Sequence, residues 1–510
     1  MHAARHKGKV GGTMEYLYES TRNKQLTSTA SQAVLSGIAG DGGLFVMREL
    51  DEISLNVREL IQCDYPEMAQ RILGRLLPDI PAEEMAACVQ NAYGSFDTPE
   101  VTPLVKVGRN WVLELFHGPT CAFKDVALQI LPHFMTAAKK LNRDSRETVI
   151  LTATSGDTGK AALEGFKDVV GTKIIVFYPE SGVSAVQKAQ MVTQEGKNTY
   201  VCGIRGDFDD AQTGVKRIFA DEGIINTLKG NNQSFSSANS INIGRLAPQV
   251  VYYFYAYKRL LEQGAISLGD KVNFVVPTGN FGDIFAGKIA KMLGLPVNRL
   301  ICAANSNNVL FDFITTGKYD RKRELKKTIS PSMDILVSSN LERLLYYVSG
   351  KDNSLVAKLM RALNDEGEYT IPAFMHKEIL KDFSVGYAND AMAMEAIARC
   401  WNKYGYLLDT HTGVAMSVLR DYHLSTADDT PAVVLSTASP YKFSNSVFEA
   451  IFGSKERSEL GSEYEIMAAL EQKTGVGIPR SLAELQAKPV RHSSVCDRDK
   501  MSSFVLNAAK

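Results

Sequence analysis

The arrangement of apolar and polar positions changes near residue 148. From there on, compact apolar runs of strand length alternate with longer segments in which apolar residues recur at helical spacing. The predicted strands are residues 148–153, 173–178, 199–204, 271–276 and 432–436, and the predicted helices are residues 159–166, 184–194, 207–221, 246–261 and 284–293. Strands that alternate with helices of roughly 10–15 residues predict parallel sheets with right-handed crossovers.

The two ends of the chain depart from this α/β pattern. Residues 14–100 predict a mostly helical N-terminal domain. Residues 1–13 are basic and Gly-rich and lack the apolar centre of a secretory signal, so we expect a flexible extension. A short mitochondrial presequence is the alternative. Residues 491–510 predict a loosely ordered tail.

Composition narrows the classes of function. The 510 residues are too many for one typical core and predict two or three domains. Lys plus Arg and Asp plus Glu both number 57, so neither nucleic acid nor an anionic membrane is an expected partner. No apolar run approaches the ~20 residues of a membrane helix. The seven cysteines are dispersed singly, which favours a cytoplasmic protein and predicts no metal site.

One lysine lies in a setting that suggests covalent chemistry. The segment FHGPTCAFKD, residues 116–125, places Lys124 after a Gly-Pro turn and at the predicted start of a helix. Apolar neighbours and a helix N-terminus disfavour the ammonium form and lower the pKa of a lysine. Because a neutral amine attacks an aldehyde, Lys124 is a candidate for forming a Schiff base with a cofactor. Such a cofactor would need a phosphate cradle and a partner for a pyridine ring.

Two strand-to-helix loops could bind anions. The first, residues 278–283 (TGNFGD), offers backbone N–H groups at a helix N-terminus, although a plain turn is the alternative. The second, residues 154–160 (TSGDTGK), superficially resembles an ATPase phosphate loop. That template requires Gly at 154 and Ser or Thr at 161, where this chain has Thr and Ala, so magnesium-nucleotide binding is not expected. Its hydroxyl and amide groups could hold a carboxylate, or Ser155 or Asp157 could cap the helix.

Two further polar segments are candidates for ligand contacts. Residues 239–245 (NSINIGR) include Arg245, which could bind a phosphate bidentately or form a surface salt bridge beside a helix cap. Residues 436–443 (STASPYKF) place the hydroxyl of Thr437 at the end of a strand, where it could face a pyridine nitrogen or cap a helix. His117 and His411 are adjacent to these motifs and could support them.

Taken together, these segments resemble threonine synthase, a family of pyridoxal-phosphate enzymes with the tryptophan-synthase-β-like fold. The likeness covers nearly all of residues 14–443 and is greatest to the longer form of enteric bacteria and fungi. Several long motifs in the right order make it far more specific than any one of them. Beyond the segments above, the motifs are YESTR at 18–22, YPESGVSAVQKAQM at 178–191, GDFDDAQTGVK at 206–216 and SPSMDILVSSNLERLL at 330–345.

The resemblance implies an α/β protein of fold type II, with two parallel-sheet domains and the cofactor between them. The expected large domain comprises residues 101–147 and 270–490, and the expected small domain comprises residues 148–269. Five residues depart from common family residues, but these changes are conservative or lie outside the polar groups. They are Cys121, Val126, Ala211, Thr410 and Gly413.

The resemblance also assigns roles residue by residue. Lys124 matches the catalytic Schiff-base lysine, Thr437 matches the hydroxyl at the pyridine nitrogen, and Asp157 matches the contact to the ring hydroxyl. The cofactor-phosphate loop matches Gly279, Asn280, Phe281, Gly282 and Asp283. The substrate carboxylate and phosphate sites match Ser155, Thr158, Asn239, Ser240 and Arg245.

The implied reaction converts O-phospho-L-homoserine and water to L-threonine and phosphate, the last step of threonine biosynthesis, by γ-elimination and β-hydration. A monomer or a homodimer fits this expectation. Three alternatives stay open. They are a related phospho-lyase that releases 2-oxobutyrate, a non-catalytic ligand-binding or secreted regulatory protein, and an ATP-dependent enzyme, which the failed phosphate-loop match disfavours.

Overall fold

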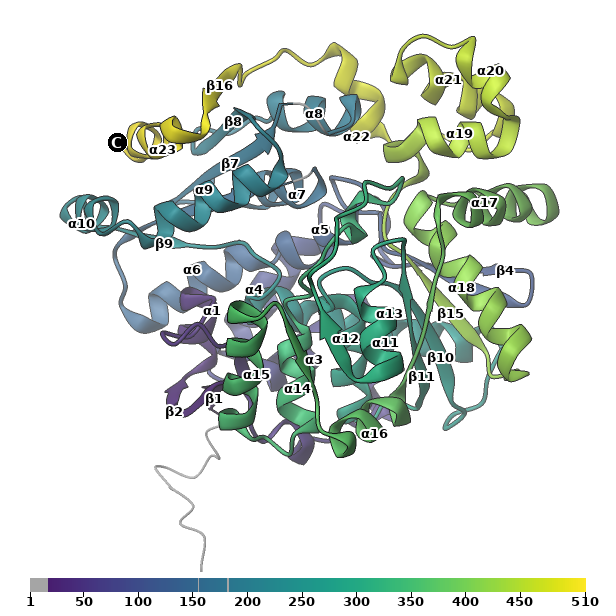
Figure 1. The fold of residues 1–510 in the computed structure, drawn as a ribbon, viewed down its shortest axis with the longest axis horizontal. Helices are drawn as coiled ribbons and strands as arrows, with labels where there is room; N and C mark the ends of the chain where they lie inside the picture. The colour runs from purple at the N-terminus through teal and green to yellow at the C-terminus, as the bar shows by residue number, and fades with distance from the viewer. Residues whose placement is uncertain (1–16, 155, 181–182) are drawn as a thin grey trace, which may run out of the picture.

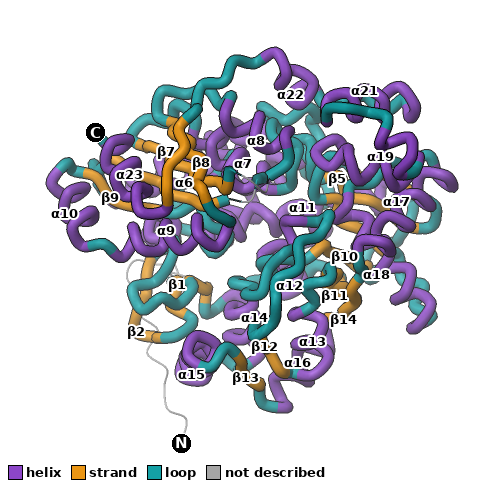
Figure 2. The backbone as a smooth tube through the Cα atoms, turned by 45° about the horizontal axis from the view of Figure 1, so that its top comes forward, coloured by secondary structure: helices purple, strands orange, loops and turns teal. Residues whose placement is uncertain are grey.

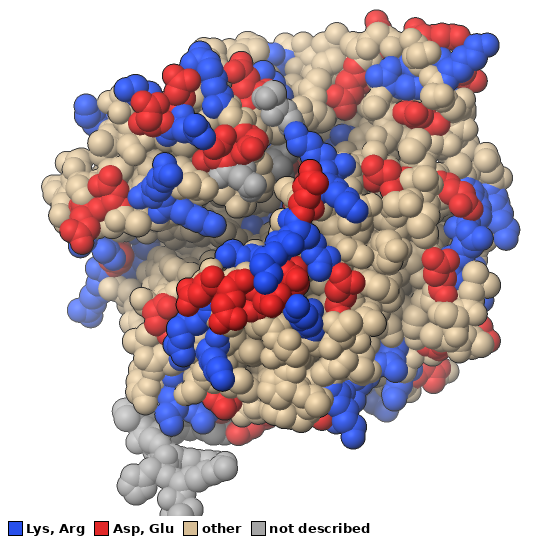
Figure 3. Space-filling model, viewed as in Figure 1, with Lys and Arg blue, Asp and Glu red and all other residues tan. Residues whose placement is uncertain are grey.

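Two parallel sheets organise the computed structural model, which describes residues 17–154, 156–180 and 183–510 (Figure 1). The predicted N-terminal extension and Ser155 lie outside these ranges. No helix among the described residues is both long and apolar enough to cross a membrane. Basic and acidic side chains are interspersed over the face seen in Figure 3.

The larger sheet has six strands in the order β14-β11-β10-β15-β5-β4. All neighbours pair in parallel except the edge hairpin of β4 and β5. Strands β10 and β15 are buried along their whole length, which explains their unbroken apolar sequences. The strands are β4 (Leu104–Val107), β5 (Asn110–Glu114), β10 (Val272–Pro277), β11 (Val297–Ala304), β14 (Phe383–Tyr387) and β15 (Ala432–Ser436).

The order and direction of the strands in this sheet bring the predicted motifs together. Strands β5, β15 and β10 are adjacent and parallel, so their carboxyl ends meet at one edge. The chain leaves β5 toward Lys124, β15 toward Thr437 and β10 toward Gly279. Three segments that are up to about 300 residues apart in sequence are thereby brought to one place.

The smaller sheet has five strands, all parallel, in the order β16-β8-β7-β6-β9. Its strands are β6 (Glu147–Ala153), β7 (Thr172–Pro179), β8 (Thr199–Arg205), β9 (Gln233–Ser236) and β16 (Ser494–Asp497). Its helices are α7 (Asp157–Phe166), α8 (Ala185–Val192), α9 (Phe208–Ala220) and α10 (Glu222–Gly230).

The end of the chain corrects one prediction. Residues 491–510 are not a loosely ordered tail, because they contain β16 and the helix α23 (Met501–Ala509). Strand β16 pairs with β8 at the edge of the small sheet, and α23 lies beside β7 and α9 (Figure 2). Met501 and Val505 are buried among the apolar side chains of this domain. The carbonyl of Ala509 accepts hydrogen bonds from Lys173 Nζ at 2.8 Å and Gln233 Nε2 at 2.6 Å.

The segment before β16 connects the two sheets. Figure 1 shows it in yellow, passing from the helices that follow the large sheet to the edge of the small one. Its elements are α21 (Glu463–Thr474), α22 (Arg480–Ala483) and the 3-10 helix η4 (Glu484–Ala487). Arg491 N then donates to Val192 O at 2.8 Å, which attaches the segment to the end of α8.

The N-terminal part contains the predicted helices and also a three-stranded antiparallel sheet, β2-β1-β3. The YESTR motif fixes this sheet to α14 (Leu341–Val348), because Arg22 pairs with Glu342 at 2.8 Å and Tyr346 Oη donates to Glu19 Oε1 at 2.7 Å. The elements are β1 (Tyr18–Ser20), β2 (Asn23–Ser28), α1 (Ala30–Ser36), β3 (Phe45–Met47), η1 (Leu50–Glu52), α2 (Val57–Leu60), α3 (Tyr65–Leu76) and α4 (Ala82–Tyr93).

A buried helix, α11 (Ile243–Glu262), lies at the centre of the molecule and packs against α3, α5 and α12. The helices nearest the site are α5 (Lys124–Leu128), α6 (Leu131–Asn142), α12 (Gly282–Met292), η2 (Pro331–Met333), α18 (Thr410–Thr426) and η3 (Pro440–Phe443). The remaining elements are α13 (Val309–Thr316), β12 (Lys318–Asp320), α15 (Asn353–Asp365), β13 (Glu368–Thr370), α16 (Ala373–Asp382), α17 (Asp390–Tyr404), α19 (Ser444–Phe452), α20 (Ser454–Ser458) and η5 (Arg498–Lys500).

Candidate active site

Hydrogen bonds to a neighbouring segment and within the loop itself fix the loop that carries Lys124. Phe123 N donates to Thr437 O at 2.8 Å and Ser439 N donates to Cys121 O at 3.0 Å, so this loop pairs with the segment that follows β15. Within the loop, Asp125 accepts hydrogen bonds from the backbone N–H and the hydroxyl of Thr120, at 2.8 and 2.7 Å. The Gly-Pro turn and the following aspartate thus fix the direction in which Lys124 leaves the backbone.

Lys124 is 9% exposed and faces two polar partners. Its Nζ donates to Ser332 Oγ at 3.2 Å and lies 3.7 Å from Asp157 Oδ2. Burial lowers the pKa of Lys124 to about 8; the Asp157 carboxylate opposes this shift, and the cations Lys442 and Arg245 add to it. The reactive neutral amine is therefore populated near neutral pH.

Asp157 forms a buried ion pair with a lysine that the sequence argument did not select. Lys442 is fully buried, and its Nζ lies 2.6 Å from Asp157 Oδ1 and donates to Thr120 O at 3.1 Å. Burial alone would raise the pKa of Asp157, but Lys442 and Lys124 outweigh it and hold that pKa well below its usual range. Gln187 Nε2 also donates to Asp157 Oδ1, at 3.0 Å. Asp157 is thus a permanent carboxylate beside Lys124.

Asp157 is not the helix cap that was considered as an alternative. Thr154 Oγ1 accepts from the N–H of Gly156, the N-cap of α7, and from that of Gly159 in its first turn, both at 2.9 Å. The aspartate side chain is left free to face the lysines. Thr158, in the first turn of the same helix, is partly exposed.

The 3-10 helix η2, which follows β12, supplies Ser332, and this serine connects Lys124 and Asp157. Ser332 Oγ accepts from Lys124 and donates to Asp157 Oδ2 at 3.4 Å. Ser332 N donates to His411 Nε2 at 3.2 Å, while His411 Nδ1 lies 2.9 Å from Asp409 Oδ1. Because Nε2 accepts a hydrogen bond, the proton of a neutral His411 lies on Nδ1. His411 therefore positions Ser332 and does not reach Lys124.

The loop between β10 and α12 has the form of an anion cradle. Within the described residues, the N–H groups of residues 279–284 have no protein acceptor. The carbonyl groups of this loop, in contrast, do have protein partners. Ser338 Oγ donates to Gly279 O at 2.7 Å, and Asn340 N donates to Asn280 O at 3.0 Å. Phe281 adopts the left-handed conformation with φ 62°, which turns the chain into the helix. Six consecutive free donors at a helix N-terminus fit a phosphate group.

Within this cradle the side chain of Asp283 points away from the free N–H groups. Its Oδ1 accepts from the hydroxyl of Tyr253 at 3.1 Å and from that of Tyr252, both on α11. Burial raises the pKa of Asp283 to about 7, with the two tyrosines opposing the shift. Only the backbone N–H of Asp283 belongs to the cradle.

Arg245 is a buried cation without an anionic partner among the described residues. It is 3% exposed, its Nη1 donates to Ala238 O at 2.9 Å, and its Nε has no partner. Burial lowers the pKa of Arg245 to about 10. The alternative of a surface salt bridge is therefore wrong. A guanidinium that is desolvated and unpaired is unfavourable by itself and fits a site that takes an anionic ligand.

The other residues predicted to contact ligands differ in their burial and in their partners. Thr437 is buried, and its hydroxyl has no partner in the described part of the chain. Asn239 is exposed, and its Oδ1 accepts from Ser240 Oγ at 3.2 Å. Asn242, between them and Arg245, caps α11 through Gly244 N at 2.8 Å. Ser155 lies outside the described residues.

Comparison with known proteins identifies the family. Residues 17–93 match the threonine synthase N terminus, residues 96–438 match the pyridoxal-phosphate-dependent enzymes, and residues 412–505 match the threonine synthase C-terminal region. The chain belongs to the threonine synthase family of pyridoxal-phosphate-dependent enzymes. Its cofactor is pyridoxal phosphate.

Relatives in several organisms support this assignment. Threonine synthase of Pseudomonas aeruginosa is 38% identical over 483 residues, which cover 94% of this chain and 98% of that protein. Threonine synthase-like 1 of Homo sapiens is 41% identical over 446 residues, covering 85% of this chain. The chain spans only 59% of the length of that human protein.

Solved structures confirm the predicted fold class. Pyridoxal-phosphate-bound threonine synthase from Brucella melitensis superposes with a TM-score of 0.85 at 36% identity, covering 97% of this chain and all of that one. Threonine synthase from yeast also superposes with a TM-score of 0.85, at 30% identity, covering 97% of this chain and 98% of that one. The chain thus has the two parallel-sheet domains and the N-terminal helical region of these enzymes.

The residues present fit the cofactor. Lys124 offers an amine of lowered pKa to an aldehyde, and the free N–H groups of residues 279–284 offer donors to a phosphate. The hydroxyl of Thr437 is a candidate donor for a ring nitrogen, since the pairing of residues 121–123 with 437–439 holds it next to the Lys124 loop.

Proposed function

We propose that this enzyme is a threonine synthase that converts O-phospho-L-homoserine and water to L-threonine and phosphate. The observation that carries the proposal is that two separate anion-binding groups flank Lys124. The cradle at residues 279–284 accounts for the phosphate of the cofactor. The unpaired Arg245 supports a second anion, as a phosphorylated substrate requires.

In this proposal Lys124 holds the cofactor and moves protons. When bound, pyridoxal phosphate supplies an electron sink for negative charge at the substrate α-carbon. With a pKa of about 8, the amine of Lys124 can take the α-proton and return a proton later at neutral pH. Ser332 and Asp157 orient Nζ through contacts of 3.2 and 3.7 Å. Thr437 and Asp157 would contact the ring nitrogen and the ring hydroxyl.

Substrate anions would bind on the side of the site formed by α7 and the start of α11. Arg245, Asn239 and Ser240 belong to one group of donors, and Ser155 and Thr158 belong to the other. Closure of residues 148–269 together with 494–510 over the remaining domain would exclude water until it is needed. We place the enzyme in the cytoplasm, as a monomer or a homodimer.

Product analysis tests the reaction. Purified holoenzyme is incubated with O-phospho-L-homoserine, and the products are identified by mass spectrometry. The proposal predicts L-threonine and phosphate in equal amounts. Release of 2-oxobutyrate with phosphate would instead assign a phospho-lyase, which shares the site and differs in the fate of one intermediate. Absence of phosphate release would contradict both reactions.

The role of Arg245 has its own test. Arg245→Met should raise KM for O-phospho-L-homoserine by about tenfold or more, since one charge-assisted contact to an anion is lost. Bound cofactor, measured by its absorbance, should stay at the wild-type level. Loss of the cofactor would show that Arg245 serves the cofactor phosphate and that our division of the two anion sites is wrong.

A further inference from the structure

An acidic side chain lies at the anion cradle. Asp283 is the only charged residue of segment 278–284, it is 7% exposed, and its N–H is one of the free donors. A phosphate oxygen that this N–H holds would lie close to the carboxyl group of the same residue. Because both groups are shielded from water there, a carboxylate and a phosphate would repel each other strongly. The cradle therefore fits its ligand only if Asp283 carries no charge.

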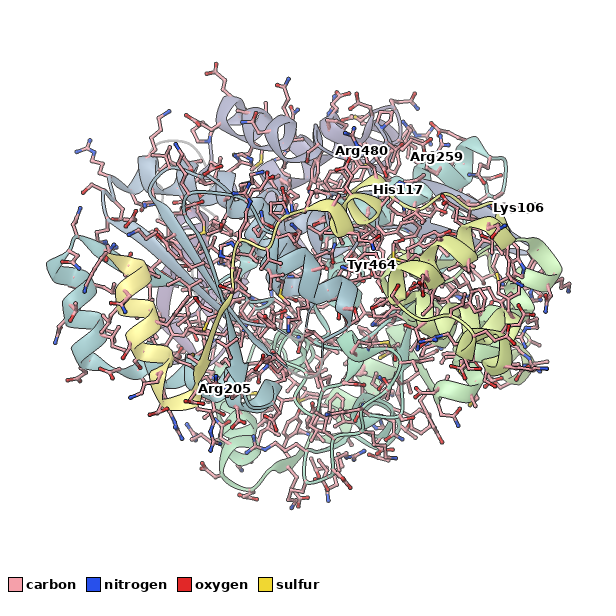
Figure 4. All side chains as sticks on the ribbon, turned by 90° about the horizontal axis from the view of Figure 1, so that it is seen from above. Lys106, His117, Arg205, Arg259, Tyr464 and Arg480 are labelled. Atoms are coloured by element: carbon pink, nitrogen blue, oxygen red, sulfur yellow. The ribbon has the colours of Figure 1, made fainter. Side chains whose placement is uncertain are left out.

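No cation of the described residues compensates the charge of Asp283. The titratable groups in contact with its carboxyl group there are the hydroxyls of Tyr252 and Tyr253 on α11. Arg259, at the end of α11, pairs with Glu262 at 2.5 Å, and Figure 4 shows it near the edge of the molecule. The other cations on α11, α12, α14 and β11 bind acceptors elsewhere, and they are Arg245, Lys258, Lys288, Lys291, Arg299 and Arg343.

The hydrogen bonds around this carboxyl group need one hydrogen more than the ionised form provides. Tyr253 Oη lies 2.9 Å from the backbone carbonyl oxygen of Asp283 and 3.1 Å from its Oδ1. Tyr252 Oη also contacts Oδ1, and it lies 3.4 Å from Gln249 Oε1. With an ionised Asp283, these contacts share only the two hydroxyl hydrogens. In addition, Asp283 Oδ2 is buried and has no partner among the described residues.

A proton on Oδ1 would supply the missing hydrogen. Oδ1–H would donate to Tyr253 Oη, whose own hydrogen would go to the nearer carbonyl oxygen of Asp283, while Tyr252 would donate to Oδ1. The unpaired Oδ2 would then be an uncharged carbonyl oxygen, which is less costly to bury than a carboxylate oxygen. Burial raises the pKa of Asp283 to about 7, so this proton is exchanged near neutral pH.

We propose that Asp283 takes up a proton from solvent when the cofactor phosphate enters the cradle, and that it is neutral in the holoenzyme. No other bond forms or breaks in this step. The proposal rests on the cofactor phosphate occupying residues 279–284, as in the proposed function, and not on which product the enzyme releases. Since the bound phosphate raises the pKa of Asp283 further, cofactor affinity should be highest below about pH 7 and should fall as pH rises.

Proton uptake by the apoenzyme tests the proposal. The ligand is 4-deoxypyridoxine 5′-phosphate, which has the ring and the phosphate but no aldehyde, so Lys124 forms no bond to it. Calorimetric titrations at about pH 7.5, in buffers of different ionisation enthalpy, give the number of protons taken up. The wild type should take up about three quarters of a proton more than Asp283→Asn, because that fraction of a group with a pKa of about 7 is ionised at this pH. The exposed Asp429→Asn should match the wild type.

Affinity and infrared spectra give independent readings. Between about pH 7 and 9, the Kd of the wild type should rise by about tenfold or more relative to that of Asp283→Asn, which has no proton to lose. The infrared difference between ligand-bound and free enzyme should show a protonated carboxyl group forming in the wild type and none in Asp283→Asn. If that variant does not fold, Tyr252→Phe takes its place, since removal of a hydrogen bond to Oδ1 should shift the band.

Equal proton uptake by the wild type and Asp283→Asn would overturn the proposal. A wild-type spectrum without a new protonated carboxyl band would overturn it as well, and so would a band that Asp283→Asn retains or that Tyr252→Phe leaves in place. None of these measurements involves turnover. Release of 2-oxobutyrate from O-phospho-L-homoserine would therefore refute the proposed reaction without affecting the role of Asp283.

Discussion

At the scale of single residues, the site is defined by an excess of buried positive charge. Lys124, Lys442 and Arg245 are all buried, and Asp157 is the carboxylate that faces the two lysines. Such an arrangement is costly in an empty protein and becomes favourable when anionic ligands enter. The charge of the site thus matches a cofactor phosphate and a phosphorylated substrate.

Removal of Lys442 should show what the buried ion pair contributes. Lys442→Met leaves Asp157 with a weaker counter-charge, so we expect the free energy of unfolding to fall by about 3–5 kcal/mol, measured by urea denaturation. The double variant with Asp157→Asn should recover much of this loss, because no carboxylate is then left unpaired. Equal stability of the single and double variants would contradict a direct pairing.

Lys124 should become reactive over a defined pH range. In the apoenzyme, the rate of covalent cofactor capture should rise with pH and reach half its maximum near pH 8, because the neutral amine forms as pH rises through its lowered pKa. Asp157→Asn removes the charge that opposes this shift, so the midpoint should move below 8. Absorbance-monitored reconstitution measures it, with the exposed Asp429→Asn as control. A midpoint that moves upward would rule out our assignment of causes.

Some of these residues could be predicted from the sequence, and others could not. Lys124, Arg245 and the 278–283 loop could be selected, because a lysine after a Gly-Pro turn and a Gly-rich strand-to-helix loop carry local signals. Lys442 lies within the segment STASPYKF but has no local sign of burial, since the Asp157 that neutralises it is 285 residues away (442 minus 157). Ser332 and Gln187 were missed for the same reason.

At the scale of elements, the cradle depends on close contact between two loops. A Cβ on Gly279 would lie 2.6 Å from the carbonyl oxygen of Ser332, so the β10–α12 loop and the Ser332 loop touch through backbone atoms. Only glycine allows this approach. The contact places the free N–H groups beside the serine that orients Lys124.

Gly279→Ala should therefore weaken the cofactor site. The added methyl group must push the Ser332 loop away, and we expect the cofactor dissociation constant of the apoenzyme to rise by about tenfold, since strain of 1–3 kcal/mol is introduced. Titration followed by absorbance measures it. Gly230→Ala is the matched control, because nothing lies within 4 Å of a Cβ there. Equal affinities of the two variants would show that the loops separate without cost.

Helices and strands could be predicted where the local pattern of apolar residues matches their burial in the fold. Strands β10 and β15 are buried on both faces and appear in the sequence as unbroken apolar runs. Strand β16, with the sequence SVCD, has only four residues and none of them is fully buried, so its pairing with β8 comes from the tertiary structure. The prediction of a tail failed for this reason.

At the scale of the whole molecule, the last residues complete a domain that begins near residue 147. A chain that ends at residue 490 would lack β16 and α23 and would expose the apolar side chains that Met501 and Val505 cover. We expect it to unfold at a lower temperature and to form larger species in size-exclusion chromatography. The full chain with the exposed Asn507→Ala is the control. An unchanged melting temperature and elution volume would restore the expectation of a dispensable tail.

The position of β16 also bears on how the protein is made. Strands β6 to β9 leave the ribosome first, yet the edge of β8 remains uncovered while some 250 further residues are synthesised, from 237 to 493. Strands β10, β11, β14 and β15 of the large sheet are made during that interval, so the small sheet becomes whole only after β16 has been synthesised. A chain cut short during translation would therefore carry an open strand edge, available to quality-control factors that recognise unpaired backbone.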